Sequence, residues 1–323
     1  MVKVFVRASA LNGEALAPPS KSYTHRAVVL ASLSNGLSRI ENPLISEDTL
    51  ATIEGCRALG ASIEQRDGLL LIEGAKGLHA PSNVIDVKNS GTTLRFLTAV
   101  SSLCKEGYTV LTGDDSIRGR PMQPLLDALV ALGVECWSTR LNGRAPIVVK
   151  GGGIEGGFVE LPGHISSQFI SALLIATPKA RRRTEIKIQG KMVSRPYVEA
   201  TLKTIRMFGG EVEEKDQTFL VHPKQDYRPT RFSVPGDFSS ASFLLVGAAL
   251  TEGRVKVKGL DFSLPQADMA IVKILDEMGA DVMVDRIEGS ITVKGTDELK
   301  GGELDLSDSP DLLPLVSVLA LKA

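Results

Sequence analysis

Several residue types are scarce in this sequence of 323 residues, and their scarcity narrows the classes of function. Aromatic residues make up only 5% of the chain, and Trp137 is its one tryptophan. Single-stranded nucleic acids bind proteins largely by stacking bases on aromatic rings, so this composition argues against such a partner. The formal net charge is −1, which gives the chain no general attraction for polyanions. We therefore expect no nucleic-acid partner.

Cysteine and histidine are also scarce, and neither shows the spacing of metal ligands. The three cysteines, Cys56, Cys104 and Cys136, lie in or beside apolar segments without a CxxC pair. This placement is typical of reduced thiols in a core. The four histidines lack ligand spacing as well. We expect no metal site.

Long hydrophobic runs are missing too. The apolar run FLLVGAAL is far too short to cross a bilayer. The first eleven residues, MVKVFVRASAL, alternate like a β-strand and contain no apolar core of an export signal. These features predict a cytoplasmic protein that does not enter a membrane.

What the sequence does contain is a repeat. A helix-like segment that ends in an apolar residue and a glycine, followed by two strand-like segments, occurs four times. Glycine at this place suits the left-handed residue that ends many helices. The marker glycines are spaced by 73, 76 and 70 residues; they are Gly60, Gly133, Gly209 and Gly279.

A second marker precedes each copy: an apolar helix that begins behind a cap rich in serine and threonine. The four segments are PSKSYTHRAVVLASL, NSGTTLRFLTAV, HISSQFISALLIA and GDFSSASFLLVGAAL. Each leads to a strand such as YTVLTG and then to a second helix. The unit therefore reads strand, helix, strand, helix, hairpin (βαβαββ). Its parallel crossovers predict an α/β fold.

A fifth unit begins with LDLSDSPDLLPLVSVLALKA, which contains the strand, the cap and the first helix. Repeat proteins rarely end in an open unit, because its apolar face would lack cover. We therefore expect the last units of the fold to be missing from this chain.

Three of the capped helices carry cations or hydroxyls in the first turn, where free amides and the helix dipole attract anions. Any one of these segments is better explained as a simple cap. Three of them at matching places in consecutive repeats favour a common anionic ligand. The residues are Lys21, Ser22 and Arg26; Gly91, Thr92 and Arg95; Ser166, Ser167 and Gln168.

Seven segments resemble, in order and spacing, those of the EPSP synthases, which are 3-phosphoshikimate 1-carboxyvinyltransferases. The segments are APPSKSYTHRAVVLASL, KNSGTTLRFL, LTGDDSIRGRP, GHISSQFISALL, VSRPYVEATL, PGDFSSASFLL and DLSDSPDLLPL. The resemblance implies the enolpyruvyl transferase fold, an inside-out α/β barrel in two domains of three units each. One domain would span residues 16–229. The other, incomplete, would join 1–15 to 230–323.

The resemblance also implies a reaction. The enolpyruvyl group of phosphoenolpyruvate is transferred to the 5-hydroxyl of shikimate 3-phosphate, and phosphate is released. This step belongs to the shikimate pathway, which leads to chorismate and the aromatic amino acids. Both substrates are small molecules, no metal or organic cofactor takes part, and we expect a monomer.

Roles for single residues follow from the same resemblance. Lys21 and Arg120 resemble the residues that hold phosphoenolpyruvate, with the amide of Gly91 near its phosphate and Gln168 contacting both substrates. Asp311 resembles the aspartate that accepts the 5-hydroxyl proton, so Lys21 and Asp311 are the catalytic candidates. The residues that would bind shikimate 3-phosphate are Lys21, Ser22, Arg26, Ser166, Ser167, Gln168, Ser194, Tyr197 and Asp311.

Two alternatives remain open at this point. UDP-N-acetylglucosamine enolpyruvyl transferase shares the fold, but it typically has Lys-Asn where this chain has Lys21-Ser22. It also has a cysteine loop where this chain reads DDSIRGRP. The second alternative is a non-catalytic fragment that binds a ligand. The family segments that supply a catalytic glutamate and part of the phosphoenolpyruvate clamp have no counterpart here, so activity of the chain as written is in doubt.

Overall fold

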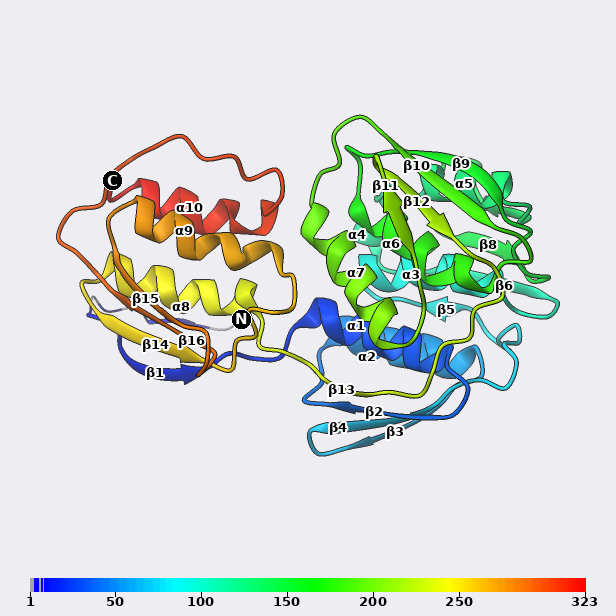
Figure 1. Ribbon diagram of the computed structural model, residues 1–323, viewed down its shortest axis with the longest axis horizontal. Helices are drawn as coiled ribbons and strands as arrows, with labels where there is room; N and C mark the ends of the chain where they lie inside the picture. The colour runs from blue at the N-terminus through cyan, green and yellow to red at the C-terminus, as the bar shows by residue number, and fades with distance from the viewer. Residues whose placement is uncertain (1–2, 6, 8) are drawn as a thin grey trace. The chain divides into compact units, whose positions relative to one another are not determined.

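The computed structural model describes residues 3–5, 7 and 9–323, and these form two compact units (Figure 1). One unit is Lys21–Val234, and the other joins Met1–Ser20 to Pro235–Ala323. The units contain four described sheets of four strands each.

All four sheets have the same topology. The first strand of each runs parallel to the second, the second pairs antiparallel with the fourth, and the fourth pairs antiparallel with the third. A helix connects the first two strands and another connects the second and third wherever the unit is continuous in sequence. The predicted βαβαββ repeat is therefore confirmed.

The unit Lys21–Val234 contains three of these sheets. Their strand orders are β13-β2-β4-β3, β5-β6-β8-β7 and β11-β12-β10-β9. The strands are β2 (Leu37–Glu41), β3 (Ser62–Arg66), β4 (Leu69–Glu73), β5 (Ile85–Asp86), β6 (Tyr108–Thr112), β7 (Cys136–Ser138), β8 (Ile147–Lys150), β9 (Gly157–Pro162), β10 (Thr184–Gln189), β11 (Glu213–Lys215), β12 (Thr218–Val221) and β13 (Arg231–Ser233). The helices are α1 (Lys21–Ser32), α2 (Glu47–Ala58), α3 (Gly91–Ser101), α4 (Asp115–Arg118), α5 (Gln123–Ala131), α6 (Ser167–Ala176), the 3₁₀ turn η1 (Thr177–Lys179) and α7 (Arg195–Met207).

Three helices form the centre of this unit, with the sheets outside them (Figure 1). Nearly every residue of α1, α3 and α6 is buried. They consist mostly of apolar and small residues, with the polar His25, Arg26 and Arg95 buried among them, and helices of that kind are stable only in the interior. The strands β2 and β4 alternate between buried and more exposed positions, so their sheet has one face toward solvent. The unit is inside-out, with helices in the core and sheets around them.

The marker glycines end four helices as predicted. Each follows the last residue of its helix by two positions and has a positive φ, between +79° and +113°. A residue with a Cβ would be strained in this conformation, which explains glycine here. The glycines are Gly60 after α2, Gly133 after α5, Gly209 after α7 and Gly279 after α9.

Two sheets take their first strand from a distant part of the chain. Strand β13 runs parallel to β2, pairing Arg231 with Arg39. Strand β1 (Asn12–Leu16) runs parallel to β14 (Arg254–Lys258), pairing Asn12 with Arg254. The chain therefore leaves one unit, builds the other and returns to complete the first.

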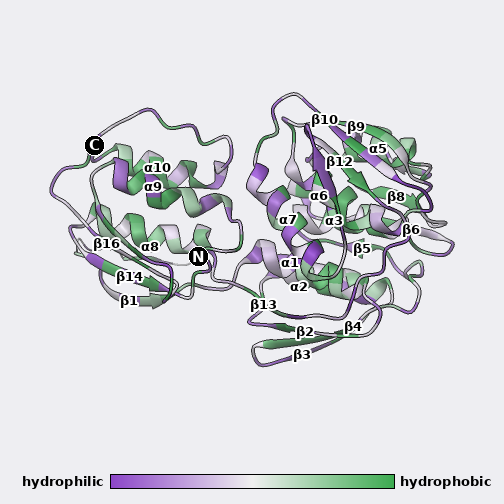
Figure 2. Ribbon diagram, viewed as in Figure 1, coloured by the Kyte–Doolittle hydropathy of each residue, from purple (hydrophilic) through white to green (hydrophobic). Residues whose placement is uncertain are grey.

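The unit that joins both ends of the chain has one sheet, in the order β1-β14-β16-β15. Its helices α8 and α10 are mostly green, for hydrophobic, in Figure 2. Leu315 and Leu319 of α10 pack into the same core as Phe238 and Leu245 of α8. The remaining elements are β15 (Asp281–Asp285), β16 (Ser290–Lys294), α8 (Phe238–Leu250), η2 (Ala267–Met269), α9 (Ala270–Glu277), η3 (Pro310–Leu312) and α10 (Leu313–Ala320).

Two predicted strands are not formed where expected. The first strand begins at Asn12, and the described residues before it are irregular; residues 1–2, 6 and 8 lie outside the described part. Strand β14 offers only five residues for pairing, and all five pair with 12–16. Residues 304–306 are irregular as well, because the part of the chain described here provides no neighbouring strand for them.

The cysteine prediction is confirmed, since all three are free and buried. Among the described residues, no helix is long and apolar enough to cross a membrane.

Candidate functional site

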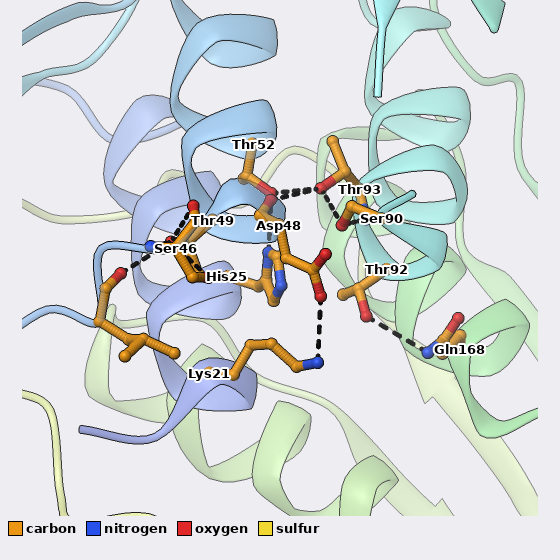
Figure 3. Close-up of polar contacts among 11 residues, drawn as sticks. Lys21, His25, Ser46, Asp48, Thr49, Thr52, Ser90, Thr92, Thr93 and Gln168 are labelled. Atoms are coloured by element: carbon orange, nitrogen blue, oxygen red, sulfur yellow. Dashed lines mark hydrogen bonds and ion pairs between the residues drawn. The ribbon is translucent and has the colours of Figure 1, made fainter. Parts of the chain in front are cut away.

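The first turns of α3 and α6 meet at equivalent positions of their repeats. Thr92 and Gln168 are each the second residue of their helix, and Nε2 of Gln168 donates to Oγ1 of Thr92 at 3.2 Å (Figure 3). Ser22 is the second residue of α1. The three segments singled out by their caps thus begin three helices of one buried core.

Two arginines converge on the start of α3. A Cβ added to Gly91, the first residue of this helix, would clash with Nη1 of Arg95 and lie 2.9 Å from Nη1 of Arg120. Arg120 is exposed, whereas Arg95 is 5% exposed, and Nε of Arg95 has no partner among the described residues. Two guanidinium groups beside the positive end of a helix can bind a phosphate or a carboxylate.

The environment of Arg95 destabilises its positive charge. Burial lowers its pKa to about 10, and the positive charge of Arg120 adds to the effect. Its hydrogen bond to the carbonyl of Pro121 is long, at 3.5 Å, and its guanidinium lies over the ring of Phe169. A bound anion would stabilise both guanidiniums, so the site is electrostatically prepared for one.

Lys21 is the first residue of α1, and it forms an ion pair with Asp48 (Figure 3). The Nζ–Oδ2 distance is 3.0 Å, and the lysine side chain is 51% exposed. Asp48 lies in the first turn of α2, where a carboxylate also complements the helix dipole. The ion pair places the amine of Lys21 at the protein surface, where a substrate can reach it.

Arg26, by contrast, is buried and bound to the protein. Its guanidinium donates to the carbonyl of Ser22 at 2.9 Å, to the carbonyl of Tyr197 at 2.8 Å and to Oγ1 of Thr201 at 2.7 Å. Burial lowers its pKa to about 10. The side chain therefore ties α1 to the first turn of α7, and its contact with a substrate carboxylate stays a prediction.

The remaining hydroxyls begin α6 and α7. Oγ of Ser166 caps α6 by accepting from the amide of Gln168 at 3.2 Å, and Ser167 is the first residue of that helix. Ser194 precedes α7 in the left-handed region, at φ 54° and ψ 37°. A non-glycine residue there is strained by about 1–3 kcal/mol, which is typical of functional sites.

Asp311, the other catalytic candidate, lies in the second unit and is exposed. In that unit Asp268 is 1% exposed, and its carboxylate bonds to Oγ of Ser239. Burial raises the pKa of Asp268 to about 6, with smaller contributions from Asp311 and Asp237. This grouping of carboxylates was not predicted.

Sequence reasoning missed Asp48 as well, and it left Arg95 without a role. The acidic residues Glu47 and Asp48 look like ordinary first-turn residues of a helix, and only the fold places Asp48 against Lys21. The signal for Arg95 was its position four residues after Gly91, on the same face of the helix. Among the described residues, no group of three or more His, Cys, Asp or Glu side chains could hold a metal ion.

Repeated βαβαββ units around buried helices, with cations at the helix N-termini, match the enolpyruvyl transferase fold that the sequence resemblance implied. The structure is similar to EPSP synthase from Acinetobacter baumannii, with a TM-score of 0.82 and 30% identity over 98% of this chain and 72% of that one. Within this class the chain belongs to the EPSP synthase family (3-phosphoshikimate 1-carboxyvinyltransferase), whose sequence model matches residues 6–323.

Archaeal relatives give the same result. The chain is 46% identical to the 3-phosphoshikimate 1-carboxyvinyltransferase of Methanocaldococcus jannaschii, over 96% of this chain and 72% of the relative. It is 50% identical to that of Methanothrix thermoacetophila, over 99% of this chain and 75% of the relative. The predicted family and fold class are confirmed, and the chain is related to transferases throughout its length.

Proposed function

We propose that this chain transfers the enolpyruvyl group of phosphoenolpyruvate to the 5-hydroxyl of shikimate 3-phosphate and releases phosphate. The observation that carries the proposal is the convergence of Arg95 and Arg120 on Gly91, at the N-terminus of α3. This arrangement suits the phosphate of phosphoenolpyruvate, while Lys21 supplies a third cation in the same unit. Binding two small anionic substrates requires several such positive positions.

The hydroxyls at the starts of α6 and α7 suit the second substrate. Ser166, Ser167 and Ser194 would donate to the 3-phosphate of shikimate 3-phosphate, assisted by the positive ends of the helix dipoles of α6 and α7. Gln168, which bonds to Thr92 of the neighbouring repeat, would contact both ligands. Tyr197 is the third residue of α7 and would lie beside the shikimate ring.

The chemistry needs proton transfers in addition to binding. The methylene of phosphoenolpyruvate must be protonated, and the 5-hydroxyl must lose its proton as it attacks. Lys21 has an exposed ammonium that can donate or stabilise charge. Asp311 is exposed on the first turn of η3 and would accept the hydroxyl proton.

Further proposals concern organisation. We propose that the two compact units are the two domains of the family, one of them the three-repeat domain that binds most of shikimate 3-phosphate. We also propose that the protein is a cytoplasmic monomer that acts in aromatic amino acid biosynthesis. Size-exclusion chromatography with light scattering tests whether the protein is a monomer.

The decisive experiment is an assay of phosphate release from phosphoenolpyruvate. We expect release that depends on shikimate 3-phosphate, with 5-enolpyruvylshikimate 3-phosphate identified by mass spectrometry. UDP-N-acetylglucosamine serves as the alternative acceptor, and release with it alone would favour the sister enzyme. Binding of shikimate 3-phosphate without any release would instead identify a ligand-binding protein.

A further inference from the structure

A buried chain of hydrogen bonds connects three helices behind the candidate site (Figure 3). It starts at Nδ1 of His25 on α1, 2.7 Å from Oγ1 of Thr52 on α2. Oγ1 of Thr52 lies 2.6 Å from Oγ1 of Thr93 on α3, which in turn lies 2.6 Å from Oγ of Ser90, the cap of α3. Oγ1 of Thr93 also donates to the carbonyl of Asp48 at 3.3 Å.

This chain of hydrogen bonds ends at the groups that shape the candidate site. Ser90 accepts from the amide of Thr93 at 3.2 Å and so fixes the first turn of α3, where Gly91 lies. The carbonyl of Asp48 belongs to the residue whose carboxylate holds Lys21. His25 itself is 1% exposed, so it acts only through its neighbours.

Counting protons determines the tautomer of His25. The chain contains four contacts that each need one proton: His25–Thr52, Thr52–Thr93, Thr93–Ser90 and Thr93–Asp48. The three hydroxyls supply only three protons, because each carries one. A proton on Nδ1 of His25 fills the fourth contact and sets the direction from His25 through Thr52 and Thr93 to the carbonyl of Asp48, with Ser90 donating to Thr93.

The other ring nitrogen is consistent with this count. Nε2 of His25 is buried without a partner among the described residues, and in this tautomer it is a bare acceptor. The charged neighbours that act on the ring are Asp48, which favours protonation, and Lys21 and Arg26, which oppose it. Burial dominates and lowers the pKa of His25 to about 3, so the ring stays neutral at physiological pH.

We propose that His25 is a positioning residue whose Nδ1–H supplies the proton that completes this chain. It thereby fixes the starts of α2 and α3, and with them Asp48, Lys21 and Gly91, in the arrangement that receives phosphoenolpyruvate. The link to phosphoenolpyruvate rests on the proposed function, whereas the tautomer of His25 and the chain of hydrogen bonds do not.

The first test is nitrogen NMR of ligand-free protein labelled at its four histidines. The signal that disappears in His25→Asn belongs to His25. We expect a neutral Nδ1–H tautomer that does not titrate between about pH 5 and 8, where ordinary histidines do. A pKa near 6.5, or an Nε2–H tautomer, would overturn the proposal.

The second test compares kinetic parameters. Thr52→Val breaks the chain without changing side-chain shape, and we expect it to raise KM for phosphoenolpyruvate about tenfold while kcat changes less than about threefold. His25→Leu should do the same, whereas His25→Asn, whose amide can donate from the place of Nδ1, should restore KM to within about threefold. The double variant His25→Leu with Thr52→Val should be no worse than either single one, because both break the same chain.

The matched control is Thr98→Val. Oγ1 of Thr98 is buried on α3, and its one partner among the described residues is in the same helix, the carbonyl of Leu94 at 2.7 Å. The proposal would be overturned if Thr52→Val and Thr98→Val raised KM for phosphoenolpyruvate equally. It would also be overturned if KM of His25→Asn were as high as that of His25→Leu. If the wild-type chain has no turnover, the same variants are compared by calorimetry with phosphoenolpyruvate. An absence of turnover would count against the proposed function alone, because the tautomer of His25 and the binding constant for phosphoenolpyruvate are measured without catalysis.

Discussion

Nε2 of Gln168 donates to Oγ1 of Thr92 at 3.2 Å, across 76 residues of sequence. The same number of residues separates the marker glycines Gly133 and Gly209 of the two repeats. The hydrogen bond therefore joins equivalent positions of neighbouring units. A repeat in sequence becomes a cluster in space because the starts of α3 and α6 face a common point.

Arg120→Ala should weaken binding of phosphoenolpyruvate by at least about tenfold, because one of the two guanidiniums beside Gly91 is lost. Folding stability should change by less than about 0.5 kcal/mol, since Arg120 is exposed. Calorimetry and urea unfolding measure the two effects. The control is Arg118→Ala, a nearby arginine that bonds to Asp115 and Gly113. Equal losses for both substrates would argue that Arg120 is misassigned.

Gly91→Ala should raise KM for phosphoenolpyruvate more than KM for shikimate 3-phosphate. The added methyl would lie 2.9 Å from Nη1 of Arg120 and would clash with Arg95, so the guanidiniums must move away from the anion position. The backbone itself is helical and accepts alanine. Steady-state kinetics with each substrate varied in turn measures the difference. An unchanged KM for phosphoenolpyruvate would place its phosphate elsewhere.

Ser194→Gly should separate stability from binding. Glycine relieves the left-handed strain at φ 54°, and after its own entropic cost we expect a gain of about 0.5 kcal/mol in the free energy of unfolding. Binding of shikimate 3-phosphate should weaken about tenfold, because the hydroxyl is lost. Ser194→Ala is the control, with the same loss of binding and no gain in stability. Wild-type affinity in both variants would remove Ser194 from the phosphate site.

Arg26→Lys should destabilise the unit Lys21–Val234 by roughly 2–4 kcal/mol. A lysine cannot reach the three separate acceptors that the guanidinium fork contacts on Ser22, Tyr197 and Thr201. Unfolding is followed by the fluorescence of Trp137, which lies on β7 of this unit. The exposed Arg206→Lys is the control, with a change below about 0.5 kcal/mol. Equal stabilities would show that these hydrogen bonds contribute little.

Stability should also depend on pH through His25. Its pKa is about 3 in the folded protein and near the ordinary histidine value of 6.5 in the unfolded chain. Between these values the unfolded state binds a proton that the folded state does not, so stability decreases as pH falls below 6.5. From pH 7 to pH 5 the loss from this group should be about 2 kcal/mol. Urea unfolding of wild type and His25→Asn measures it, and an identical pH dependence would contradict it.

The repeat and the helix caps were predictable because they depend on local chemistry. The local backbone conformation favours glycine at a left-handed position and serine at a helix start. Gly60 therefore predicts the end of a helix, and Ser90 predicts the start of one. The family resemblance then supplied roles for Lys21 and Arg120. Neither the helix caps nor the resemblance predicts which residues of different repeats come into contact.

The parts that were missed depend on contacts between repeats. Asp48 becomes a partner of Lys21 only when α1 packs against α2, and Arg95 meets the ring of Phe169 only when α3 packs against α6. The strand expected at 304–306 failed for a related reason, since a strand pattern forms a strand only where a neighbour pairs with it.

The parallel pairing of β1 with β14 has a consequence for synthesis on the ribosome. The amide of Leu11 bonds to Oγ1 of Thr251, 240 residues later in the chain. At typical elongation rates this partner emerges on the order of tens of seconds after the first strand. The segment Lys21–Val234 can meanwhile complete its three sheets, because β13 is made before β14. Strand β1, although synthesised early, is thus among the last strands of the protein to reach its native place.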